Sequence, residues 1–128
     1  MKKRIFDNLL IIFSLFFLAS CATTSASYNV QNELSKVEKC KEIEPFFTKS
    51  RVCLKQSVIA SEVIFPELVT DMEDLTDLLE ERVNQNKIAN EMAWKLFEDN
   101  LVIATEAMTN NDVTRTSNSI NSFMETLQ

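Results

Sequence analysis

After residue 29, apolar side chains recur every three or four positions, which is the period of an amphipathic helix. Short polar or proline-containing breaks divide this pattern into five segments. We therefore predict helices over residues 30–42, 51–65, 66–83, 88–108 and 113–127. Amphipathic helices joined by short turns favour an all-α fold, a small antiparallel bundle of four to five helices.

Each predicted helix carries an apolar stripe that would face a common core. In the first three predicted helices the stripes are Val30, Leu34, Val37 and Cys40; then Leu54, Val58, Ile59 and Val63; then Leu68, Met72, Leu75, Leu79 and Val83. In the fourth, two ladders of i, i+4 spacing, Ile88-Met92-Leu96 and Ala89-Ala93-Phe97-Leu101, are continued by Ala104 and Met108. In the fifth, the stripe is Val113, Ser117, Ile120, Phe123, Met124 and Leu127. The run Val63-Ile64-Phe65 also fits a short strand. Pro66 suits the first position of a helix, and Asp112 is placed to cap the last one.

The first 20 residues have a different pattern. Three basic residues at positions 2–4 precede an apolar run over residues 9–19. A membrane-spanning helix needs about 20 apolar residues, so this run has the length of a signal peptide. The segment Leu18-Ala19-Ser20-Cys21 ends it and resembles the lipobox of bacterial lipoproteins. The alternative is an ordinary secretory peptide cleaved after Ala22 or Ala26.

The lipobox resemblance implies a specific modification. Cys21 would receive a diacylglyceryl group on its sulfur, the leader would be removed before it, and the new amine would be acylated. Ala22 follows, whereas an Asp there tends to retain such lipoproteins in the inner membrane, so we expect the periplasmic face of an outer membrane. The predicted organisation is a cleaved signal peptide over residues 1–20, a lipidated Cys with a short tether over 21–29, and a helical domain over 30–128.

The amino-acid composition excludes several classes of functional site. The chain of 128 residues has no His and no Gly, which excludes His-dependent nucleophiles, His-ligated metals and glycine-rich phosphate loops. Without residues 1–20, 10 basic and 18 acidic side chains remain, a net charge of −8 that argues against nucleic acid as a partner. We therefore expect no enzyme activity, no metal and no cofactor.

Cys40 and Cys53 remain once Cys21 is assigned to lipid. In an oxidising periplasm they most simply form a disulfide, which would join the end of the first helix to the start of the second. A metal or redox pair is the alternative, although a Cys-x-x-Cys spacing is absent from the sequence.

Three aromatic residues are candidate contacts with a partner: Trp94, Phe46 and Phe47. All three also suit the core. Glu73, Asp77 and Glu81 form a column along one flank of the third helix, which fits either a solvated face or a site for cations or a basic partner.

These patterns favour a non-enzymatic interaction or assembly module in the envelope, held to the membrane by lipid. Pilotins, the small outer-membrane lipoproteins that escort secretin subunits, are similar in size and plan, without a shared motif. The alternatives are an immunity, exclusion or inhibitor lipoprotein that binds a basic partner, and a small-molecule carrier. A homo-oligomer also fits the regular stripe of the last helix.

Overall fold

A computed structural model of the chain describes residues 30–61 and 63–128, and the predicted signal peptide and tether lie outside these residues. The regular secondary structure of the described part is all helical, with no strand, which confirms the all-α prediction. The N-terminal helix covers residues 30–43. It is followed by the 3₁₀ turn η1 (Phe47–Lys49), α2 (Arg51–Cys53), the π-helical turn η2 (Leu54–Ile59), α3 (Pro66–Asn84), α4 (Asn90–Asn110) and α5 (Val113–Leu127).

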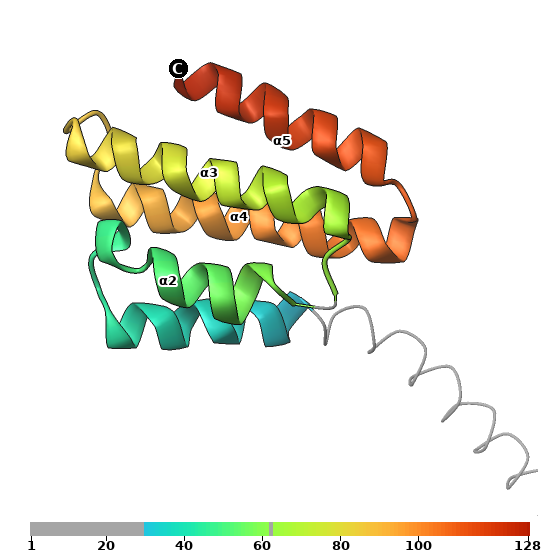
Figure 1. Cartoon of the computed structure of the whole chain (residues 1–128), viewed down its shortest axis with the longest axis horizontal. Helices are drawn as coiled ribbons and strands as arrows, with labels where there is room; N and C mark the ends of the chain where they lie inside the picture. Colours follow the sequence, from blue (N-terminus) through green and yellow to red (C-terminus); the bar gives the residue numbers. More distant parts are fainter. Residues whose placement is uncertain (1–29, 62) are drawn as a thin grey trace, which may run out of the picture.

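The helices form a layered antiparallel bundle (Figure 1). Helices α3 and α4 run side by side through its centre, with α5 on one side of them and the N-terminal helix with α2 on the other. The largest fully buried side chains come from every layer: Phe47, Leu54, Ile59, Leu68, Met72, Leu75, Leu79, Trp94, Phe97, Leu101 and Ile120. One continuous core therefore joins the layers.

The second helix is shorter than predicted. It ends at Ile59, and residues 63–65 are neither helix nor strand. Pro66 accounts for the last of these residues, because it occupies the start of α3 and restricts Phe65 to extended backbone. Phe65 accordingly has φ −57° and ψ 140°. Ile64 still reaches the core, but from a turn in which its N–H bonds to the carbonyl of Ser61.

The fourth helix begins and ends two residues later than predicted, and part of its predicted stripe is wrong. Its buried face follows Ala93, Phe97, Leu101 and Ala104, so Met92 and Met108 point away from the core and are 46% and 40% exposed.

In this chain without Gly, two asparagines adopt the positive φ angles that the turns of the bundle require. Asn86 (φ 56°) follows α3, and Asn111 (φ 50°) follows α4, both in the left-handed region that Asn tolerates better than most residues. The carboxylate of Asp112 then accepts a hydrogen bond from the Arg115 N–H at 3.2 Å, which confirms the predicted cap of α5.

Within the described residues, no helix combines the length and the apolar character needed to cross a membrane.

Candidate functional site

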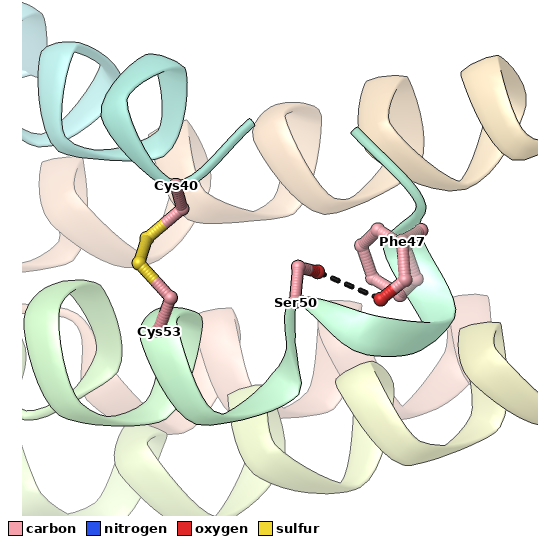
Figure 2. The surroundings of a disulfide bond; sticks show 4 residues. All are labelled: Cys40, Phe47, Ser50 and Cys53. Atoms are coloured by element: carbon pink, nitrogen blue, oxygen red, sulfur yellow. Dashed lines mark hydrogen bonds between the residues drawn. A yellow bond between two sulfur atoms is a disulfide. The ribbon is translucent and has the colours of Figure 1, made fainter. Parts of the chain in front are cut away.

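The predicted disulfide is present and shapes one end of the bundle (Figure 2). Cys40 and Cys53 are bonded, with their Cα atoms 5.7 Å apart, so their sulfurs are not free ligands for a metal. The bond ties the N-terminal helix to α2 and closes the connecting loop. Within that loop, the Ser50 hydroxyl donates to the Phe47 carbonyl at 2.7 Å and fixes the η1 turn.

The same loop is also fastened to the start of α4. The Asn90 side chain accepts a hydrogen bond from the Phe47 N–H at 2.7 Å and donates one to the Pro45 carbonyl at 3.0 Å. The Trp94 indole N–H donates to that same carbonyl at 3.0 Å. Residues 45 and 47 are therefore both held against α4, on either side of Phe46.

This arrangement separates the three aromatic residues that the sequence suggested as contacts. Phe47 is fully buried and Trp94 is 1% exposed, with their rings in edge-to-face contact at 5.1 Å. A partner cannot contact these two rings on the folded surface, because the core encloses them. Phe46 is 58% exposed and is the one member of the set that lies at the surface.

Two further apolar side chains accompany Phe46 at this end. Ile43, in the last turn of the N-terminal helix, is 77% exposed, and Val52, in α2, is 64% exposed. These three are the most exposed large apolar side chains in the described part of the chain, ahead of Met92, Met108 and Ile103. We call Ile43, Phe46 and Val52 the loop-end surface.

Sequence reasoning missed Ile43 and Val52, and their spacing gave no signal. Ile43 lies three residues after the buried Cys40, and Val52 lies seven residues before the buried Ile59, so helical spacing alone would place each of them near a buried stripe.

Charges around this end are unevenly paired. Lys41 lies 3.6–3.7 Å from the carboxylates of Glu38 and Glu98. By contrast, Lys39 and Lys49 make no ion pair with a described residue, and Lys49 Nζ lies 5.4 Å from the centroid of the Phe46 ring. Glu42 and Glu44 make no ion pair with a described residue either, so the unpaired charges beside the loop-end surface are two positive and two negative.

Some of the acidic side chains of α3 form ion pairs and hydrogen bonds with neighbouring helices of the bundle. Asp77 lies 3.0 Å from the Arg51 guanidinium and 3.3 Å from Lys55 Nζ, which attaches α3 to the second helical segment. Asp71 accepts hydrogen bonds from Ser117 at 2.6 Å and Asn121 at 3.3 Å, which attaches α3 to α5. The structure shows no group of three possible metal ligands among the described residues.

Elsewhere on the surface, Lys95 donates a hydrogen bond to Asp99 at 2.7 Å, and this carboxylate raises the pKa of Lys95 above its ordinary value. Both side chains are exposed, so the pair is solvated.

Two surface hollows are lined mainly by polar and charged side chains. One, of about 360 Å³, lies between α4 and α5 and includes Glu106, Asp112 and Arg115. The other, of about 410 Å³, includes Arg51, Asp77 and Glu80. Neither has the apolar lining expected of a carrier for a small apolar molecule.

The predicted lipidation site, Cys21, lies outside the described residues. Comparison of the chain with known protein families, curated proteins and solved structures found no match. The functional argument therefore rests on the surface of this chain.

Proposed function

We propose that the protein is a small, lipid-anchored envelope protein that acts as a non-enzymatic interaction module. The lipobox-like segment at residues 18–21 supports the anchor, and Ala22 supports the periplasmic face of the outer membrane. Two or three acyl chains at Cys21 would hold the protein stably, since each buried CH₂ contributes about 0.8 kcal/mol. A tether over residues 22–28 would reach at most about 25 Å, which keeps the domain near the membrane.

The observation that carries the interaction role is the loop-end surface. Exposed apolar side chains lower the solubility of a monomer, yet the three most exposed large ones of the described residues all lie on one disulfide-closed segment. Hydrogen bonds from Asn90 and Trp94 hold that segment in place, so binding there would lose little conformational freedom. This plan is similar to that of pilotins at the level of architecture alone.

Two measurements test the proposal. Metabolic labelling with a palmitate analogue should mark the wild-type protein and leave Cys21→Ser unlabelled. Crosslinking in intact cells, followed by membrane isolation and mass spectrometry, should return one envelope protein in fixed proportion. Recovery of the protein alone, with a bound small molecule in native mass spectrometry, would contradict the interaction role and favour a carrier.

The acidic character of α3 supports a second candidate, an immunity or inhibitor lipoprotein that binds a basic partner. The helix has seven acidic residues and one basic residue, and Glu67, Asp74 and Glu81 remain exposed. Binding through this flank would weaken steeply with salt, and charge reversal at Asp74 would abolish it.

A further inference from the structure

Helix α4 carries apolar side chains on its solvent-facing side. Outside the loop-end surface, the exposed large apolar side chains of the described residues are Met92, Ile103 and Met108, and all three lie on this helix. Met92 and Ile103 are eleven residues apart, close to three turns of an α-helix, so they lie on one face within about 20° of each other. Met108 lies near the end of the helix and is not part of this face.

The same face carries charges of both signs. Lys95 and Asp99 lie between the two apolar positions, are 66% and 55% exposed, and form an ion pair within the helix at 2.7 Å. Glu106 follows Ile103 by three residues and is also exposed. A partner for this face therefore has to match apolar side chains together with one basic and two acidic side chains.

The charges at the edges of this face do not give it a single sign. Glu91 and Glu98 are turned about 100° or more from its centre, and Glu98 lies 3.7 Å from Lys41 of the N-terminal helix. At the other edge, α5 contributes Asp112 and Arg115, one charge of each sign. The face therefore suits neither an anionic membrane nor a partner whose charges are all of one sign.

We propose that this face of α4 binds the same face of a second copy of the chain, with the two helices antiparallel and related by a two-fold axis near residues 97 and 98. Met92 of each copy then lies opposite Ile103 of the other copy, and the two-fold axis repeats this contact. The inference goes beyond the proposed envelope interaction and uses a surface different from the loop-end surface.

The charges fit the same register. When Met92 lies opposite Ile103 of the other copy, Lys95 lies within one residue, about 1.5 Å along the axis, of Asp99 of the other copy. Two ion pairs form between the copies beside the two within them, and like charges lie on the diagonals. Leu96, which is half-buried in the monomer, lies beside Leu96 of the other copy. A parallel pair would instead place Lys95 opposite Lys95, and Asp99 opposite Asp99.

This arrangement agrees with a lipid anchor on each copy. The start of the N-terminal helix lies at the same end of the bundle as the end of α4 (Figure 1). An antiparallel pair therefore puts the two starts at opposite ends, and both reach one membrane when the helices lie parallel to its surface. The contact of one helix pair is smaller than most stable interfaces, which bury about 1,200 Å² or more. Confinement to a membrane by the proposed anchor raises the local concentration and offsets this.

The test places a photo-crosslinking phenylalanine analogue at position 103 of the full-length protein in intact cells. We expect an adduct with twice the mass of the protein. Position 118, exposed on the outer side of α5, is the control and should give about tenfold less of this adduct, because it points away from α4.

Digestion of the adduct identifies the register. Trypsin cleaves after Lys87, Lys95 and Arg115, so an antiparallel pair joins the peptide 96–115 to the peptide 88–95, which contains Met92. A parallel pair would join two copies of the peptide 96–115, and that result would overturn the proposal.

Charge reversal tests the ion pairs between the copies. Lys95→Asp and Asp99→Lys should each lower the adduct yield about fivefold or more, because each places like charges opposite one another. The double variant restores the pairs within and between the copies, so its yield should return to within about twofold of the wild type. Both side chains are exposed, and circular dichroism would verify folding. Equal yields in the single and double variants would refute the assignment.

The remaining outcomes separate this inference from the proposed function. An adduct of position 103 with lipid or with a different envelope protein, or the absence of any adduct, overturns self-association. Equal self-adducts from positions 103 and 118 would show random collision and overturn it too. Capture of an envelope protein through another surface would still support the interaction role.

Discussion

At the scale of single residues, hydrogen bonds from polar side chains hold a loop of the bundle against a helix that is distant in the sequence. Asn90 is the clearest case, because one amide satisfies a backbone donor and a backbone acceptor of a loop more than forty positions earlier. Such long-range side-chain bonds have no periodic signature. The sequence therefore predicted a break near Pro45 but not the contact that fixes it.

Asn90→Ala should destabilise the protein by about 1–3 kcal/mol, because it leaves the partly buried Phe47 N–H without its acceptor. Urea unfolding followed by circular dichroism would measure this loss. Asn118→Ala, at an exposed position on α5, is the matched control and should change the unfolding free energy by less than about 0.5 kcal/mol. An equal effect of both substitutions would show that the loop bonds contribute nothing.

Replacing Asn111 by Gly and by Val should have different effects on the stability of the protein. Its φ of 50° suits Gly, so Asn111→Gly should be neutral or slightly stabilising, whereas Asn111→Val should cost about 1–3 kcal/mol. Thermal unfolding of both variants is the measurement. If Val is tolerated as well as Gly, the chain does not need the left-handed turn that separates α4 from α5.

At the scale of helices, periodicity predicted type and order well. Helix α5 matches its predicted bounds, because Asp112 caps its start and its stripe is uninterrupted. Prediction failed where neighbouring elements compete for the same residues. The run 63–65 is apolar enough to belong to a helix. In the structure α3 begins at Pro66, and Ile64 enters the core from the turn before it.

The disulfide contributes at this scale too, because it joins the N-terminal helix to the short α2, which continues into the π-helical η2. Replacing Cys40 and Cys53 by Ser should lower stability by roughly 3 kcal/mol on the chain-entropy model, since the bond closes a loop with a sequence separation of 13. Chemical denaturation under oxidising conditions tests this. In the presence of a reductant the variant and the wild type should unfold at nearly the same urea concentration; a persistent difference would assign the loss to altered packing.

The candidate surface was only partly predictable. Phe46 was named from its residue type, but the sequence could not separate it from Phe47, since both are aromatic neighbours in a proline-containing break. Burial distinguishes them, and burial depends on where α4 packs. Ile43 and Val52 could not be found from the sequence, because helical spacing places them near the buried Cys40 and Ile59, and their exposure depends on how the two helical segments pack.

At the scale of the whole molecule, stability should be graded across the layers. Helices α3 and α4 are covered on both sides, while the N-terminal helix is an outer layer tied by one covalent bond (Figure 1). Outer elements with fewer buried contacts open at lower free energy than central ones.

Hydrogen exchange with mass spectrometry should therefore resolve two behaviours on reduction of the disulfide. Amides over residues 30–43 should lose protection at least tenfold, because the constraint that holds this helix to α2 is removed. Amides in the centre of α3 and α4 should keep most of theirs. Uniform loss throughout the chain would instead show that the bundle opens as a single unit.

The disulfide also has a consequence for the timing of folding. On the proposed route, the chain crosses the inner membrane before it reaches an oxidising compartment, and Cys40 and Cys53 remain thiols until then. The reduced chain lacks the constraint that the bond supplies, so the outermost layer of the bundle is weakest while the protein awaits export. Secretion machinery that threads unfolded polypeptides would meet less resistance. Oxidation after export would then close the loop between Cys40 and Cys53, so on this route the fully stabilised domain would form only in the oxidising compartment.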